Sequence, residues 1–158
     1  MTSSGYAVVG GGAIGGTLAF ALARAGHRVT VIDSDTEHVR AIRQRGLTLE
    51  RDGERQSVSV AASTPNEFDD PLDRVLLAVK AQATEPAARW IAARLTEHGY
   101  TASLQNGFNE AVLARHLGWE RTVAAFVNLF ADVVEPGVIR DGGAGALVVG
   151  EPGGGAVS

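Results

Sequence analysis

A glycine-rich segment near the N-terminus lies between a short apolar run and a stretch with helical spacing. It is Gly10-Gly11-Gly12-Ala13-Ile14-Gly15, which satisfies the pattern G-x-G-x-x-G. In such a turn the first glycine permits a tight bend, the second lets the backbone approach a pyrophosphate, and the third lets the helix pack closely. Backbone N–H groups and the helix dipole hold the phosphates, so no lysine is required. A glycine-rich turn without a ligand is the competing interpretation.

An acidic residue stands where a bound dinucleotide would need one. Asp33 directly follows the apolar run 28–32. A carboxylate there can accept hydrogen bonds from the ribose hydroxyls, and it repels a 2′-phosphate. Asp35 adds to this repulsion, whereas Arg40 or Arg43 could still reach a phosphate. The residues therefore favour NAD as the cofactor and leave NADP as an alternative.

Two further polar residues follow predicted strands. Lys80 comes after the apolar run 74–79, and Asn106 lies in Gln105-Asn106-Gly107 after the run 100–104. The carboxyl ends of parallel strands meet at one edge of the sheet, where open α/β folds bind ligands. Singly, such a lysine is often only a solvated charge and Asn-Gly often only a turn. Together they indicate a candidate active-site edge.

The ordered set of motifs resembles the N-terminal domain of the ketopantoate reductases, the 2-dehydropantoate 2-reductases of pantothenate biosynthesis. The resemblance spans almost the whole chain and rests on residues 10–15, Ala25-Gly26-His27, Val79-Lys80-Ala81, Gln105-Asn106-Gly107 and Pro136-Gly137. It implies an NAD(P)H-dependent oxidoreductase that transfers a hydride to the ketone of a small 2-oxo acid. NADP is the cofactor that the resemblance itself suggests.

The resemblance also implies roles for individual residues. Gly10 to Gly15 would bind the pyrophosphate, while Lys80 and Asn106 would line the nicotinamide end of the cleft, with Asn106 near both cofactor and substrate. A cation and an amide donor there could orient a 2-oxo acid and stabilise charge on its carbonyl oxygen. Both residues are expected in supporting catalytic roles.

In this family a helical C-terminal domain follows and supplies the lysine that donates the proton, together with a substrate-binding carboxylate. We therefore expect residues 1–150 to form the dinucleotide-binding domain and residues 151–158 to be a tail at the start of that second domain. The chain alone would then bind cofactor without turnover. A naturally short protein is the alternative.

Several residues depart from the family pattern. Asp33-Ser34-Asp35 replaces a basic residue suited to NADP, Ala83 stands where an acidic or amide residue is common, and Phe108-Asn109 lacks a further glycine. These departures favour a relative such as an NAD-dependent D-2-hydroxyacid dehydrogenase of the same family. A free-standing, non-catalytic NAD(P)-binding module is another alternative. Lys80 followed by Gln105-Asn106-Gly107 argues against a 6-phosphogluconate or opine dehydrogenase.

Hydrophobic periodicity predicts the elements that must position these residues. Strands are expected at 6–9, 28–32, 74–79, 100–104, 122–129 and 146–149, and helices after the glycines to residue 25 and at 35–45, 86–98 and 109–117. Segments 47–50 and 56–60 should form a hairpin around Asp52-Gly53, residues 61–72 a surface loop, and 135–137 a turn. Trp90 is expected in the core. The alternation predicts one α/β domain with a doubly wound, mostly parallel Rossmann-type sheet.

Composition limits the remaining possibilities. The chain has 158 residues, a net charge of -4, 45% hydrophobic residues and no cysteine. The charge gives no general attraction to nucleic acid, and no stretch is long and apolar enough to predict a membrane span. The absence of cysteine suits a cytoplasmic protein, and the four histidines lack metal-ligand spacing, so no metal is expected. Without a second domain, apolar surface on residues 106–150 could drive formation of a homodimer.

Overall fold

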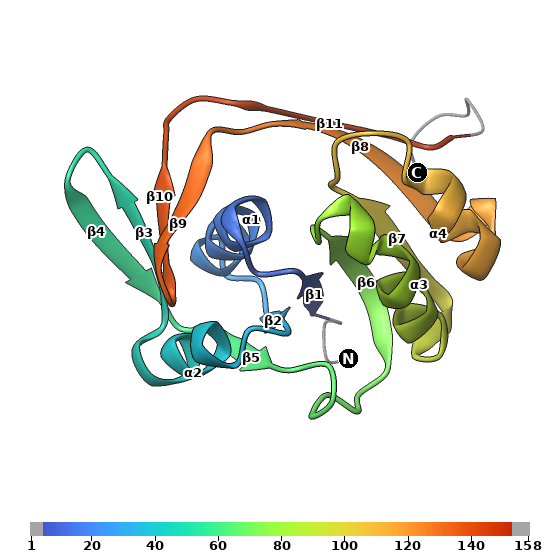
Figure 1. The fold of residues 1–158 in the computed structure, drawn as a ribbon, viewed down its shortest axis with the longest axis horizontal. Coiled ribbons are helices and arrows are strands. Elements are labelled where there is room, and N and C mark those ends of the chain that lie inside the picture. The colour runs from blue at the N-terminus through green and yellow to red at the C-terminus, as the bar shows by residue number, and fades with distance from the viewer. Residues whose placement is uncertain (1–4, 153–158) are drawn as a thin grey trace.

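A seven-stranded sheet forms the centre of the computed structural model, which describes residues 5–152 (Figure 1). In spatial order its strands are β11 (Ala146–Gly150), β8 (Thr122–Asn128), β7 (Leu95–Ser103), β6 (Leu72–Leu77), β1 (Tyr6–Val9), β2 (Val29–Ile32) and β5 (Ala61–Ser63). Every neighbouring pair is parallel except β11 with β8. The predicted mostly parallel, doubly wound sheet is confirmed.

Helices cover both faces of this sheet. Helices α1 (Ala13–Arg24) and α2 (Thr36–Arg45) pack on one face, and α3 (Thr84–Ala92) and α4 (Glu110–Leu117) on the other. Strand side chains alternate accordingly, because Val8 packs with α1 and α2 whereas Val9 packs with α3 and α4. The winding direction reverses between β1 and β6, and such a switch point is where open α/β sheets bind ligands.

Turn and cap residues explain where several elements begin and end. Asp35 caps α2, since its carboxylate accepts hydrogen bonds from the N–H groups of Glu37 and His38. Gly46 and Gly118 end α2 and α4 with positive φ angles of 80° and 88°. The short 3-10 turns η1 (Ala81–Ala83) and η2 (Trp119–Arg121) precede α3 and β8.

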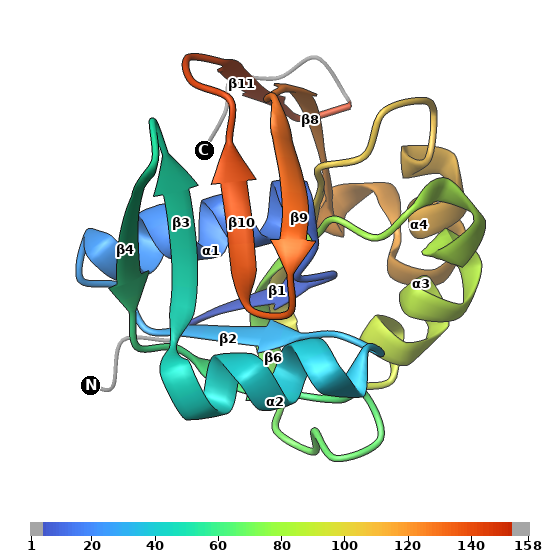
Figure 2. The ribbon, with the colours of Figure 1, turned by 60° about the vertical axis from the view of Figure 1, so that its left-hand side comes forward.

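A second, four-stranded sheet lies against α1 (Figure 2), in the order β4 (Glu54–Val58), β3 (Leu47–Arg51), β10 (Val138–Asp141) and β9 (Ala131–Glu135). Its first hairpin confirms the predicted turn, because Asp52 and Gly53 both have positive φ angles (52° and 80°). The turn at 135–137 joins β9 to β10. Neither of these two strands was predicted. Helix α1 packs between the two sheets, and its buried residues are Gly15, Gly16, Ala19 and Phe20.

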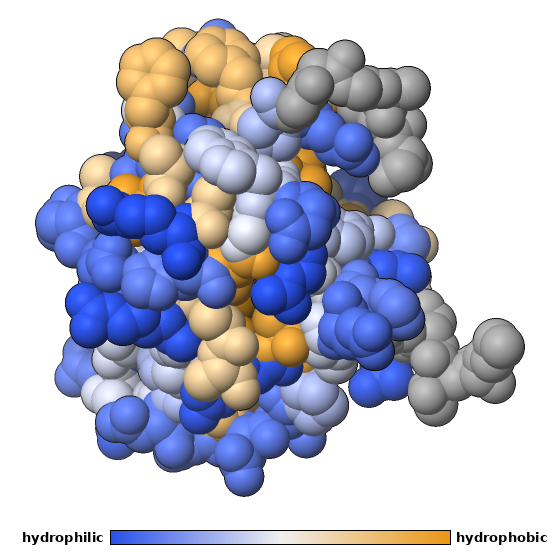
Figure 3. Space-filling view, turned by 90° about the vertical axis from the view of Figure 1, so that its right-hand side faces the viewer, coloured by the Kyte–Doolittle hydropathy of each residue, from blue (hydrophilic) through white to orange (hydrophobic). Residues whose placement is uncertain are grey.

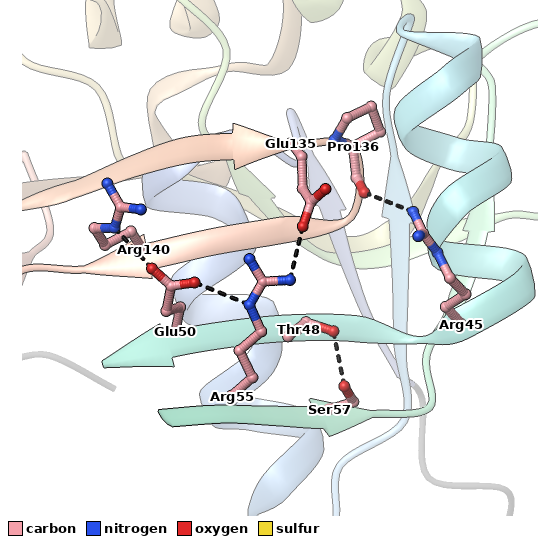
Figure 4. Close-up of polar contacts among 8 residues, drawn as sticks. All are labelled: Arg45, Thr48, Glu50, Arg55, Ser57, Glu135, Pro136 and Arg140. Carbon is pink, nitrogen blue, oxygen red and sulfur yellow. Dashed lines mark hydrogen bonds and ion pairs between the residues drawn. The ribbon is translucent and has the colours of Figure 1, made fainter. Parts of the chain in front are cut away.

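Ion pairs cross the outer side of this second sheet (Figure 4). Glu50 on β3 accepts hydrogen bonds from Arg55 and Arg140, both at 2.9 Å, and Arg55 also donates to Glu135 at 2.7 Å. The two arginines hold the pKa of the Glu50 carboxyl below its ordinary value. The network joins β3 and β4 to β9 and β10, which come from distant parts of the chain.

Two sequence predictions were wrong. The helix expected at 86–98 ends at Ala92, and Leu95 instead pairs with Leu72 as the first residue of β7. Residues 61–72 were expected to be a loop, yet 61–63 form strand β5 beside β2. In both cases tertiary pairing overrides weak local preference, because Ala-Ala-Ser has little β-propensity and residues 93–98 are compatible with a helix.

The remaining predicted helices and strands are confirmed to within a few residues at their ends. Of the expected tail 151–158, residues 153–158 lie outside the described part of the chain. Between residues 5 and 152, no helix is long and apolar enough to cross a membrane.

Candidate functional site

The glycine turn runs from the end of β1 into the start of α1, and most of it is tightly packed. Gly10 has a φ of +96°, and a Cβ there would lie 2.8 Å from the Ala78 carbonyl carbon. A Cβ on Gly15 would collide with the carbonyl oxygen of Gly10. These contacts are those expected for a tight bend followed by a closely packed helix.

Gly12 is the exception in this segment. A Cβ built on Gly12 would meet no atom within 4 Å, and its φ of -70° is one that other residues adopt readily. Gly12 is also the N-cap of α1, where no side chain caps the first N–H groups. Those groups have no partner within a helix. The start of α1 therefore offers free donors beside open space, which fits a phosphate group.

The side chains of Asp33 and His38 hold the turn by hydrogen bonds to Gly11. The Gly11 N–H donates to Oδ2 of Asp33 at 2.7 Å, and the Asp35 N–H donates to Oδ1 of Asp33 at 2.9 Å. The carbonyl oxygen of Gly11 lies 2.7 Å from Nε2 of His38, a residue that is only 4% exposed. The sequence analysis missed His38, because its spacing was judged only for metal binding and a lone histidine carries no other local signal.

A cavity of about 580 Å³ opens at the carboxyl ends of β1, β2 and β6. Four of the predicted site residues line it, namely Gly10, Gly12, Asp33 and Lys80. Gly11, Ala13, Ile14 and Gly15 do not. Ile14 packs instead with the cluster of Leu104, Ala125 and Val127.

Trp90 has two environments. Its ring packs against Phe68 and under the Arg94 guanidinium, and its indole N–H donates to the Pro65 carbonyl at 3.1 Å. The same side chain lines the cavity, beside Pro65 and Ala87. Trp90 thus packs in the interior, as expected, but it also forms an apolar wall of the cavity.

Lys80 and Asn106 lie at the ends of the neighbouring strands β6 and β7, and both are exposed. Lys80 lines the cavity, whereas Asn106 lines a separate hollow with Phe126. Gln105 connects their two segments, because its buried amide donates to the Val79 carbonyl at 2.8 Å and to the Thr84 hydroxyl at 2.7 Å. The two residues therefore belong to one hydrogen-bonded edge of the sheet, without sharing one cavity.

The cavity carries charges of both signs. Asp33 follows the end of β2, and Lys80 follows the end of β6. Arg43, considered above as a partner for a 2′-phosphate, is occupied elsewhere. Its Nε donates to the Ala62 carbonyl at 2.8 Å, and its terminal nitrogen pairs with Glu67 at 2.8 Å. Arg40 is exposed and does not line the cavity.

Comparison with curated proteins gives related sequences from several organisms. The 2-dehydropantoate 2-reductase of Mesorhizobium japonicum is 31% identical over 93% of this chain and 52% of its own length. The same enzyme of Mycobacterium tuberculosis is 31% identical over 93% of this chain and 48% of its own length. The chain therefore spans about half the length of the curated relatives that it matches.

Solved structures share the fold. A PanE/ApbA family ketopantoate reductase from Ralstonia eutropha superposes with a TM-score of 0.83 at 36% identity, over 91% of this chain and 48% of that one. D-mandelate dehydrogenase with NADH and anilino(oxo)acetate gives 0.88 at 24% identity, over 95% and 49%, and at this identity shows the fold alone. The family model described as ketopantoate reductase PanE/ApbA matches residues 6–154. On this match, the chain belongs to the ketopantoate reductase PanE/ApbA family.

Proposed function

We propose that this chain binds NAD(P)H as the nucleotide-binding part of a reductase that acts on the ketone of a 2-oxo acid. The observation that carries the proposal is the open space over Gly12, in a turn whose other glycines are closely packed. Within the G-x-G-x-x-G pattern, this is the position where the backbone should approach a pyrophosphate. The free N–H groups at the start of α1 would hold its negative charge.

The other cavity residues fit the remainder of a dinucleotide. Asp33 already accepts two backbone hydrogen bonds, and each carboxylate oxygen keeps a lone pair for a ribose hydroxyl. Trp90, Pro65 and Ala87 provide an apolar wall in the same cavity. We assign the adenosine end of the cofactor to this wall and the nicotinamide end to the side of Lys80.

Lys80 and Asn106 are proposed to support the reaction. When bound, the reduced nicotinamide supplies the hydride. The Lys80 ammonium would stabilise negative charge that develops on the substrate's carbonyl oxygen, and the Asn106 amide would orient the substrate. In the natural protein, Asn106→Ala should lower kcat for reduction of a 2-oxo acid more than it weakens NADH binding. An equal effect on both would reassign Asn106 to the cofactor.

We further propose that NAD is preferred over NADP. Asp33 lies in the cavity wall, and the ion pair with Glu67 keeps Arg43 away from it. A 2′-phosphate beside Asp33 would be repelled without a compensating cation from Arg43.

Equilibrium titration of the chain with NADH and with NADPH, followed by nicotinamide fluorescence, tests both proposals. Saturable binding of at least one cofactor is expected, with NADH binding more tightly. Tighter binding of NADPH would contradict the preference. Absence of binding for both cofactors would contradict the proposed function.

A further inference from the structure

His38 on α2 is a buried imidazole whose two ring nitrogens both contact backbone groups. The Gly137 N–H, in the turn between β9 and β10, donates to Nδ1 at 2.9 Å. Nδ1 therefore carries no proton, and in the neutral ring the proton must be on Nε2. Nε2 lies 2.7 Å from the carbonyl oxygen of Gly11, to which it donates.

The bond to Gly11 determines how the next peptide group is oriented. The Gly11 carbonyl and the Gly12 N–H belong to the same planar peptide, and none of the peptide bonds in residues 5–152 is cis. In a trans peptide the C=O and N–H point in opposite directions. Because the carbonyl points toward the buried His38 ring, the Gly12 N–H points away from it, on the side of the cavity.

We propose that His38 is a positioning residue for the dinucleotide, a role that rests on the proposed function. Its Nε2–H holds the Gly11–Gly12 peptide with the Gly12 N–H directed at the pyrophosphate. Asp33 fixes the preceding N–H of Gly11, so the turn is held on both sides of that residue. His38 itself does not line the cavity.

The His38 ring also connects the glycine turn to the second sheet. Gly137 has a φ of +80°, its carbonyl accepts from the Thr48 N–H at 2.9 Å, and Pro136 accepts from Arg45 at 3.2 Å. The Pro136-Gly137 turn is thus fixed by α2 and β3. It provides the N–H that selects the His38 tautomer, which gives this late turn a part in shaping the glycine turn at residues 10–15.

Two substitutions separate the two hydrogen bonds of His38. His38→Gln can place an amide N–H near the position of Nε2, so it keeps the bond to Gly11 and loses the bond to Gly137. His38→Asn can place an amide oxygen near the position of Nδ1, so it keeps the bond to Gly137 and loses the bond to Gly11. Each variant loses one buried hydrogen bond, and similar losses of thermal stability are expected.

The two variants should differ in cofactor affinity. NADH titrations below the unfolding temperatures of both should show about a tenfold or greater loss for His38→Asn and only a small change for His38→Gln. His98, exposed on β7, provides matched controls with the same two substitutions, which should leave affinity unchanged. Equal losses for both His38 variants would mean that the residue only stabilises the fold, and would overturn the proposal. If the unaltered chain binds neither NADH nor NADPH, the proposed function itself fails.

A measurement on the unaltered chain covers the case in which a variant does not fold. Nitrogen-15 NMR should show His38 protonated at Nε2 alone. Adding ADP, which contains the pyrophosphate, should shift the Nε2–H resonance, because a bond at the Gly12 N–H polarises the shared peptide. Adenosine should not. Protonation at Nδ1, or a resonance that does not respond to ADP, would overturn the proposal.

Discussion

Gly12 differs from the other glycines of the glycine turn, because it alone has room for a side chain. The others are Gly10, Gly11 and Gly15. The three packed glycines are explained by the fold itself, through the bend, the strand beneath and the helix. Gly12 has no such explanation, since its φ is ordinary and its surroundings are open. On the proposed function, the open space at this position is the room that a pyrophosphate needs.

Asp33 should determine which dinucleotide is preferred. Asp33→Asn keeps the size of the side chain and an acceptor for one backbone N–H but removes the negative charge. We expect the ratio of the NADPH to the NADH dissociation constant to fall severalfold, because the repulsion of a 2′-phosphate is removed. Competition titration measures both constants, and their ratio cancels any general loss of folded protein. An unchanged ratio would show that Asp33 does not discriminate.

At the scale of elements, the cap of α2 is important because Asp35 stabilises the start of the helix that carries His38. Asp35→Ala removes the acceptor for the N–H groups of Glu37 and His38, and should lower the free energy of unfolding by about 1 kcal/mol. Urea denaturation followed by circular dichroism measures it. Asp69→Ala, at an exposed loop position, is the matched control and should have little effect. Equal effects of the two substitutions would refute the capping role.

The second sheet should lose stability in acid. The pKa of Glu50 is lowered by its hydrogen bonds with Arg140 and Arg55, so its contribution is present above the ordinary carboxyl pKa and is lost as the pH falls through the lowered value. Glu50→Gln should therefore be less stable than the unaltered chain at neutral pH, and the difference should shrink on acidification. Thermal unfolding across this pH range tests it. A difference independent of pH would exclude the charge of Glu50 as the cause.

Elements that depend on local chemistry could be predicted from the sequence better than elements that depend on long-range pairing. Asp52-Gly53 predicts its hairpin and Gly46 its helix end, because the conformations they favour are determined within a few residues. Strand β5 and the early start of β7 could not be predicted, since partners in β2 and β6 select them. The same holds for β9 and β10, which complete a sheet begun by the distant β3. His38 escaped prediction for the same reason, because its partners are 27 and 99 residues away.

The sequence motifs also predicted residues that the fold brings together. The motif context placed Gly10, Gly12, Asp33 and Lys80, which line one cavity. Strand order explains why these four residues lie together, because the carboxyl ends of β1, β2 and β6 meet at the switch point. Asn106 follows β7, one strand further along, and lines a separate hollow. Its catalytic role and that of Lys80 stay predictions.

At the scale of the whole molecule, one end carries an apolar surface. Phe126 and Phe130 are 62% and 64% exposed, and Val148 is 61% exposed. Apolar side chains gather at the upper end of the molecule in Figure 3, the end at which Figure 1 shows β8 and β11. This agrees with the expectation of exposed apolar surface within residues 106–150. Such a surface marks an interaction site or favours aggregation.

We therefore expect this chain to self-associate with increasing concentration. Analytical ultracentrifugation should detect dimers or larger species, and Val148→Lys, which places a charge on this surface, should shift the equilibrium toward monomer. Glu54→Lys, on the exposed strand β4 of the second sheet, is the control and should not. A monomer at all concentrations would contradict this expectation without affecting the cofactor site.

Gly12→Val gives the most direct test of the cofactor site. Because nothing lies within 4 Å of a Cβ at this position, the variant should fold and keep its unfolding temperature. NADH affinity, measured by fluorescence titration, should nevertheless fall by at least about tenfold, since the new side chain occupies the space assigned to the pyrophosphate. Gly150→Val, where a Cβ also meets no atom within 4 Å, should bind as the unaltered chain does. Unchanged NADH affinity in a folded Gly12→Val variant would contradict the assignment.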